Sequence, residues 1–125
     1  MTTVNWADQP EDHDYPAAAS YLSLLAPTEA VDRVISALQA APVVAFKAKD
    51  VVRAAHLPML KADNFHVDRD LKKIKDGKAL SPILLVRGSG ENGTQLVIAD
   101  GYHRACAVYC NSEDDDIHAK IVDWA

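Results

Sequence analysis

The residues best suited to chemistry form one short run: Asp100, Gly101, Tyr102, His103 and Arg104. The run lies between an apolar strand-like segment and an apolar helix-like segment. A glycine turn that leads into a helix leaves the first backbone N–H groups of that helix without partners, and phosphate is a natural ligand for them. His103 and Arg104 would add side-chain donors, and Gly101 would let a phosphate approach the backbone closely. The alternative is structural: Arg104 pairs with an acidic loop, and His103 caps the end of the strand.

A second cationic group lies upstream, on one face of an expected helix. His66, Arg69 and Lys73 follow one another at i, i+3 and i+7, with Lys72 beside them. Residues at this spacing share a helix face. Such a face could supply positive charge to an anion, or it could be a solvated face with ion pairs to neighbouring acids such as Asp68.

The elements that would position both groups follow from the periodicity of apolar residues. Asn64 as N-cap and Gly77 as terminator bound a helix that carries the upstream cationic face. Strands are expected over 82–87 and 95–99, joined by a turn at 88–93. A buried helix over 102–110 follows, then an acidic loop and a strand over 117–121.

The N-terminal third of the sequence predicts a helical unit that precedes these elements. Residues 1–13 show no apolar period and form either a loose acidic arm or a capping segment. Asp14 and Thr28 are expected to cap two helices that end near Pro27 and Pro42, which gives a helical hairpin over 14–42. A short strand over 43–46 and a helix over 49–57 lead into the remainder of the chain.

Composition and charge limit the functional classes. The 125 residues suit a single domain, with 49% apolar and 25% charged residues. The net charge is −5, and residues 1–32 hold six acids and no Lys or Arg, so the chain has no general attraction for DNA or anionic lipid. No apolar run approaches the length of a membrane span, and Cys106 and Cys110 suggest neither a disulfide framework nor a zinc knuckle. A cytoplasmic protein without a structural metal is expected.

The segments "SPILLVRG", "LVIADGYHRACAVY" and "IHAKIV", in this order, resemble the ParB/sulfiredoxin superfamily over roughly residues 43–123. The resemblance implies an α+β fold, with a small mixed β-sheet flanked by helices. The N-terminal helical hairpin has no counterpart in it. In that family the helix that begins at the motif binds nucleotide phosphates.

The resemblance also implies roles for individual residues. Gly101, His103 and Arg104 fall on the phosphate-binding motif, with Tyr102 inside it. Tyr102 stands where sulfiredoxins place their catalytic cysteine, and a phenol cannot form the thiolate that their reaction needs. Sulfiredoxin activity is therefore excluded.

The upstream helix matches the same family at the positions that contact its nucleotide. His66, Arg69 and Lys73 fall on these positions, so the resemblance adds them to the expected binding site.

The sequence "DGYHR" is similar to the "DG-x-HR" of the superfamily's free-serine kinases. A carboxylate at Asp100 could steer a hydroxyl acceptor or a magnesium ion, or could simply cap the following helix. The catalytic glutamate of those kinases has no clear counterpart here. Chromosome partition, the role of ParB, would require a DNA-reading domain and a dimerisation domain that do not follow the motif.

The sequence therefore predicts a ParB/sulfiredoxin-like domain that binds a nucleotide, ATP or CTP with Mg²⁺, or another phosphorylated small molecule. Two alternatives stay open. One is a small-molecule kinase or NTPase that uses the same pocket. The other is an interaction module in which residues 14–42 dock on a protein partner or on a second copy.

Overall fold

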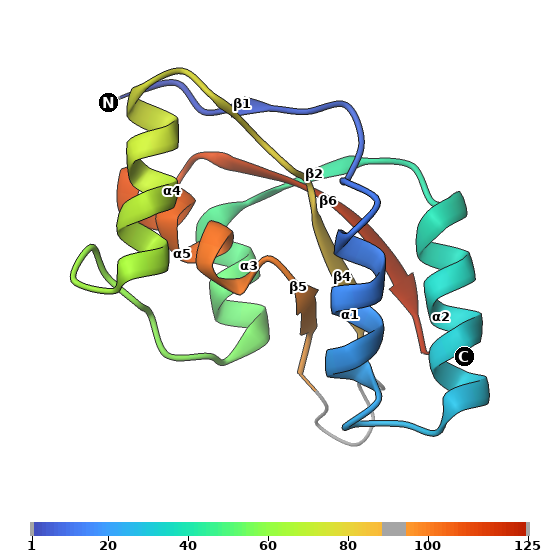
Figure 1. Cartoon of the computed structure of the whole chain (residues 1–125). Helices are drawn as coiled ribbons and strands as arrows, with labels where there is room; N and C mark the ends of the chain where they lie inside the picture. Colours follow the sequence, from blue (N-terminus) through green and yellow to red (C-terminus); the bar gives the residue numbers. More distant parts are fainter. Residues whose placement is uncertain (1, 89–94, 125) are drawn as a thin grey trace.

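A computed structural model describes residues 2–88 and 95–124 of the chain. The bounds of its helices and strands are β1 Asn5–Trp6, α1 Asp14–Leu22, α2 Thr28–Ala40, β2 Val44–Lys47, α3 Ala48–Ala55, α4 Phe65–Lys75, β3 Ala79–Leu80, β4 Ile83–Arg87, β5 Val97–Asp100, α5 Tyr102–Asn111 and β6 Asp116–Asp123. Two pairs of consecutive helices, α1–α2 and α3–α4, precede the run of strands β3, β4 and β5, and α5 and β6 end the chain (Figure 1). The turn expected at 88–93 falls, apart from Gly88, outside the described residues.

The fold is α+β, with a small mixed sheet flanked by helices, as the sequence predicts. The main sheet has the strand order β2-β6-β4-β5. Strands β4 and β6 are parallel, whereas the other two neighbouring pairs are antiparallel. The antiparallel β4–β5 pair is the predicted hairpin, and it places the end of β5 beside the start of β4.

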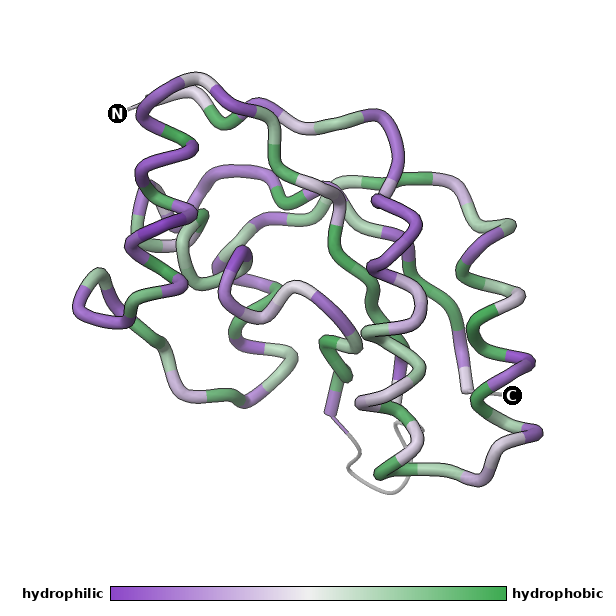
Figure 2. The backbone as a smooth tube through the Cα atoms, in the orientation of Figure 1, coloured by the Kyte–Doolittle hydropathy of each residue, from purple (hydrophilic) through white to green (hydrophobic). Residues whose placement is uncertain are grey.

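Helices cover both faces of this sheet. Ile83 and Leu85 of β4 are buried on the face covered by α3, α4 and α5. Their neighbours Leu84 and Val86 are buried on the other face, against α1 and α2. Successive side chains of a strand point to opposite faces, so a continuous apolar run such as "ILLV" is what a doubly covered strand requires. The hydrophobic colouring of β4 in Figure 2 follows this run.

The two N-terminal helices form the expected hairpin, although their first residues differ from the prediction. His13, rather than Asp14, is the N-cap of α1, and Pro27, rather than Thr28, is the N-cap of α2. The Asp14 carboxylate does not cap the helix because it accepts hydrogen bonds from the Glu11 amide and the Ser81 hydroxyl.

The apolar face of the hairpin is already used within the chain. Ala18 and Leu22 of α1 and Val34 and Leu38 of α2 pack on the sheet. Docking of a partner or a second copy through 14–42 stays a prediction, and it would have to use the outer surface of these helices.

The described part of the N-terminal segment packs on the protein body rather than forming a loose arm. Strand β1 pairs in parallel with β3 in a separate two-stranded sheet. The Trp6 ring stacks on His118 of β6, with ring centroids 5.2 Å apart. In the described part of the chain, no helix is long and apolar enough to cross a lipid bilayer.

Candidate functional site

One polar cavity of about 260 Å³ lies where β5 leads into α5. Every residue that the sequence analysis selected for a site lines it: His66, Arg69, Lys73, Asp100, Gly101, Tyr102, His103 and Arg104. The structure thus brings together two groups that are about 30 residues apart in sequence. Their proximity comes from the packing of α4 against α5.

The N-terminus of α5 opens into this cavity. The N-cap of α5 is Gly101, and no side chain of a described residue caps the helix. The first helical hydrogen bond runs from the Ala105 amide to the Gly101 carbonyl, at 2.9 Å. The amides at 102–104 therefore precede the helical hydrogen-bond pattern, and they carry the partial positive charge of a helix start.

Gly101 is required for packing as well as for any close approach of a ligand. Its φ is +108°, a backbone conformation that residues with a side chain rarely adopt. A Cβ atom built on Gly101 would lie 2.4 Å from Cγ2 of Ile83. The sequence suggests ligand access as the reason for this glycine, but the fold alone already requires it.

Helix α4 presents its cationic face to the cavity. Asn64 caps α4 by accepting hydrogen bonds from the amides of His66 and Val67 at 3.0 and 3.2 Å. The imidazole rings of His66 and His103 lie side by side, with centroids 4.6 Å apart. The N-terminal ends of α4 and α5 are therefore in contact through these two histidines.

The solvated-face alternative holds for Lys72 but not for Arg69 or Lys73. Lys72 lies outside the cavity lining and forms an ion pair with Asp68 at 3.1 Å. Arg69 and Lys73 are exposed and line the cavity, and neither makes an ion pair with another residue in 2–88 or 95–124.

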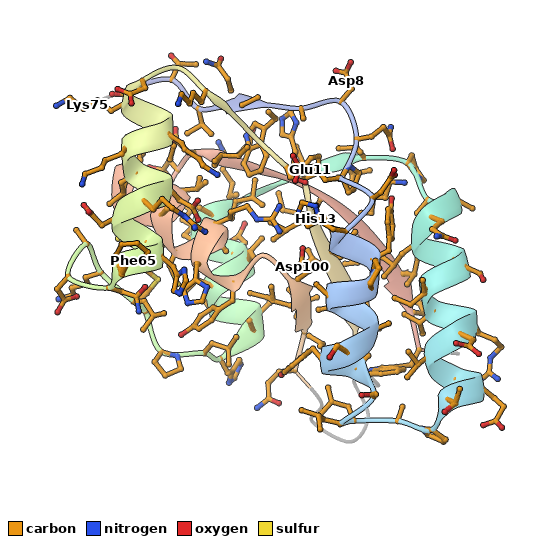
Figure 3. The ribbon with its side chains drawn as sticks, in the orientation of Figure 1. Asp8, Glu11, His13, Phe65, Lys75 and Asp100 are labelled. Carbon is orange, nitrogen blue, oxygen red and sulfur yellow. The ribbon has the colours of Figure 1, made fainter. Side chains whose placement is uncertain are left out.

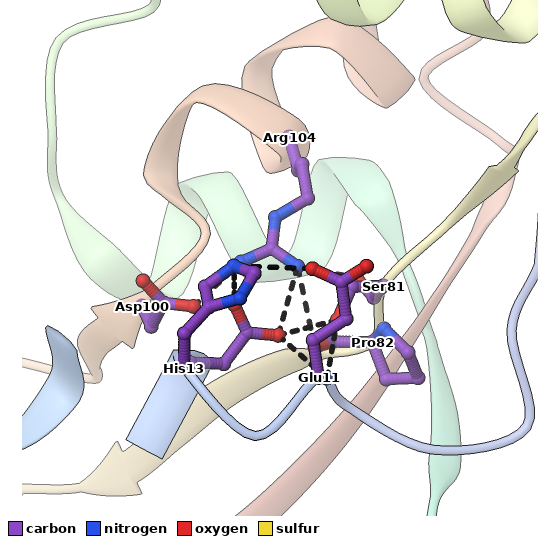
Figure 4. A network of polar contacts seen from close by, with 7 residues as sticks. Glu11, His13, Ser81, Pro82, Asp100 and Arg104 are labelled. Atoms are coloured by element: carbon purple, nitrogen blue, oxygen red, sulfur yellow. Dashed lines mark hydrogen bonds and ion pairs between the residues drawn. The ribbon is translucent and has the colours of Figure 1, made fainter. Parts of the chain in front are cut away.

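Arg104 lies in an internal polar network that the sequence did not predict (Figure 4). Its guanidinium donates to the Ser81 carbonyl and to the Asp100 carboxylate, both at 2.6 Å. The Asp14 carboxylate lies 3.8 Å away. The alternative in which Arg104 pairs with the acidic loop is wrong, because the acidic partners of Arg104 are Asp100 and Asp14. Much of the donor capacity of Arg104 is used inside the protein.

Tyr102 is also held by an internal contact. Its hydroxyl donates to the carbonyl of Pro58, in the connection between α3 and α4. The bond ties this connection to the first turn of α5. The ring of Tyr102 lines the cavity, but its hydroxyl already has a partner.

The surroundings of Asp100 change its proton affinity. Burial raises its pKa from 3.8 to about 6; Arg104 opposes this rise, and nearby Asp14 adds to it. A carboxyl with this pKa exchanges its proton near neutral pH, which is a property of acid–base groups.

The His103 imidazole is shifted in the opposite direction. Burial lowers its pKa, and the neighbouring His66 and Arg69 lower it further, while Asp70 opposes them. An anion in the cavity would favour the protonated form of His103, because opposite charge stabilises it.

Five polar lining residues were not predicted from the sequence as site residues: Glu11, His13, Asp14, Asp70 and Ser81. Figure 3 shows Glu11 and His13 near the start of α1, in the region of Asp100. Asp70 is 5% exposed, and among the described residues its side chain makes no hydrogen bond or ion pair. Its one signal in the sequence was an acid at i+4 from His66, which an ordinary solvated helix also shows.

Ligand atoms of Glu11, His13 and Asp14 lie within 4.8 Å of one another at this cavity. His13 already contacts both carboxylates, with its Nε2 3.1 Å from Glu11 and 3.5 Å from Asp14. A histidine between two acids accounts for the cluster, so the absence of a structural metal stays a prediction.

Comparisons of the chain with protein-family models, with curated proteins and with solved structures give no match. The resemblance to the ParB/sulfiredoxin superfamily therefore stays a prediction that rests on the motif and the order of elements.

Proposed function

We propose that this protein binds the phosphate group of a small molecule at the N-terminus of α5. One observation carries the proposal: cationic groups from two helices line the same cavity as the uncapped start of α5. Arg69 and Lys73 have no ion-pair partner in the described part of the chain, so their charges are available to a ligand.

The individual roles differ from those expected from the motif alone. Arg69 and Lys73 would contact the phosphate oxygens directly, with the amides of α5 below them. His103, whose pKa is lowered in the free protein, would be favoured in its protonated form as the anion binds. Arg104 would act mainly by holding Ser81 and Asp100 in place, since its guanidinium already donates to both.

The acidic wall of the cavity bears on the form of the ligand. Glu11, Asp14 and Asp70 would repel a phosphate that arrives without compensating charge. A nucleotide such as ATP or CTP usually carries Mg²⁺, which neutralises phosphate charge and prefers oxygen ligands. Glu11 and Asp14 would hold such an ion through their carboxylate oxygens, and the ion would then replace His13 as the partner of these two acids.

A thermal-unfolding panel tests the proposal. Inorganic phosphate, ATP, CTP, ADP and GTP would each be added with and without Mg²⁺. A ligand at about 100 times its dissociation constant adds about 2.7 kcal/mol to the free energy of unfolding. For a domain of this size, that is an increase of roughly 10 °C in Tm. The absence of a shift with any of these ligands would refute phosphate binding.

Variants on α4 locate the site. Lys73→Gln and Arg69→Gln are each expected to weaken binding about tenfold, since each removes one charge–phosphate contact. Lys72→Gln is the matched control, because Lys72 lies on the same helix but is paired with Asp68 outside the cavity. An equal loss in all three variants would indicate general electrostatics rather than a defined site.

Phosphoryl transfer is a second candidate function, favoured by the pKa of about 6 at Asp100 in the cavity wall. Asp100 would accept the proton of a hydroxyl group whose oxygen attacks the terminal phosphorus of a nucleoside triphosphate. The bond from that phosphorus to the bridging oxygen would break, and the nucleoside diphosphate would leave. Release of labelled phosphate, or its transfer to an added hydroxyl compound, measures this activity. Asp100→Asn should abolish turnover and leave nucleotide binding intact.

A further inference from the structure

The polar cavity is small for a complete ligand. Its volume of about 260 Å³ lies below the roughly 300 to 1,000 Å³ of typical small-molecule sites. A phosphate group fits, but the rest of a phosphorylated molecule would need space elsewhere.

A second cavity of about 460 Å³ adjoins the first. The two share one wall, made by Asp100, Gly101, Tyr102 and His103. In Figure 1 this wall is the passage from β5 into α5, with α1 on one side and the connection between α3 and α4 on the other. A ligand held at the start of α5 can therefore extend into the second cavity without leaving the protein surface.

The second cavity differs from the first in its chemistry. Its outer walls come from Ala17 and Tyr21 of α1 and from Leu57 after α3. Tyr21 and Leu57 are 44% and 38% exposed, although both carry large apolar groups. Apolar surface left open beside a polar site favours a ligand part that removes it from water.

Resting on the proposed phosphate site, we infer that the ligand is an aryl-bearing phosphate, whose aromatic ring lies against Tyr21 and Leu57 in the second cavity. An aromatic ring suits this place because it packs on the face or the edge of a tyrosine. Tyr21 lies on the N-terminal helical hairpin, so this part of the chain would set ligand specificity.

Phenyl phosphate and inorganic phosphate separate the two parts of the site. Isothermal titration of the whole chain, with and without Mg²⁺, should give an affinity for phenyl phosphate about tenfold higher than for inorganic phosphate, because the ring buries apolar surface. Equal affinities would overturn the aryl site and leave phosphate binding intact. No binding of either compound would refute phosphate binding itself.

Two surface variants test the position of the ring. Tyr21→Ser and, independently, Leu57→Ser should each remove most of the preference for phenyl phosphate without changing the affinity for inorganic phosphate. Leu24→Ser is the matched control, since Leu24 is 80% exposed near Tyr21 and does not line the cavity. A preference that survives both cavity variants, or is lost equally in the control, would overturn the inference.

Discussion

At the scale of single residues, Gly101 is subject to two separate structural demands. Its positive φ disfavours any side chain, and a Cβ would overlap Ile83. Gly77 also has a positive φ, +74°, but a Cβ atom built on it would lie near only the side-chain nitrogen of Asn5, at 3.9 Å. Alanine variants of these two glycines therefore distinguish the cost of backbone strain from the cost of steric overlap.

Gly101→Ala is expected to lower the free energy of unfolding by about 3 kcal/mol, from left-handed strain plus overpacking. Gly77→Ala should lose only about 1 kcal/mol, because strain acts there without overlap. Chemical denaturation measures both values. Equal losses would show that the contact with Ile83 is relieved at little cost.

Asp100 should make the stability of the protein depend on pH. Its pKa is about 6 in the folded protein, against 3.8 ordinarily. The folded state thus binds the proton more tightly than the unfolded chain does. The resulting stabilisation is present below about pH 4 and is lost as pH rises through 6.

Asp100→Asn tests this dependence because it removes the titrating group and keeps an acceptor for Arg104. Between pH 4.5 and 7.5, the wild-type free energy of unfolding should fall relative to that of the variant. The lowered pKa of His103 acts in the opposite direction, but His103 is present in both proteins. A difference between the two proteins that stays constant with pH would contradict the raised pKa of Asp100.

At the scale of elements, the Asn64 cap sets where α4 begins, and so where His66 and Arg69 lie. Asn64→Ala is expected to cost about 1 kcal/mol of folding stability, since two amides lose their acceptor. Asn64→Ser, which restores a capping oxygen, should recover most of that loss. Urea denaturation of the wild type and the two variants measures these differences in stability. An unchanged stability in the alanine variant would mean that water takes the place of the Asn64 side chain as acceptor.

Elements with a complete local signal were predictable from the sequence. Helix α4 has a capping asparagine, an apolar repeat and a terminating glycine, and the structure confirms all three. The start of α1 was misplaced by one residue, because Asp14 is a good cap locally but Ser81 provides a better partner for it in the fold. The preference of Asp for the N-cap position is a local effect, and here a tertiary contact overrides it.

The candidate site shows the same limit. The types and periods of His66, Arg69 and Lys73 marked a cationic face before any fold was known. Two of the three partners of Arg104 could not be predicted, because Ser81 and Asp14 lie 23 and 90 positions away from it in the chain. Long-range contacts between polar groups leave no periodic signal in a sequence.

At the scale of the whole molecule, the N-terminal third is part of both the core and the site. Helices α1 and α2 bury Leu84, Val86 and Ala99 of the sheet. The buried Lys120 of β6 donates to the Gln39 carbonyl of α2 at 3.0 Å. Glu11 and Asp14 line the polar cavity. The segment that resembles a known superfamily, roughly 43–123, therefore lacks one of the two helical layers found here.

A fragment of residues 43–125 is consequently expected not to fold cooperatively alone. Leu84 and Val86, each fully buried in the whole chain, would face water in the fragment. Each exposed side chain forfeits about 2 kcal/mol, and the total stability of a domain is only about 5 to 15 kcal/mol. Adding residues 1–42 as a separate peptide should restore a cooperative transition, because α1 and α2 are held on the sheet by packing. Thermal unfolding of the fragment with and without the peptide, followed by circular dichroism, measures this. A cooperative transition of the fragment alone would show that one helical layer is sufficient for folding.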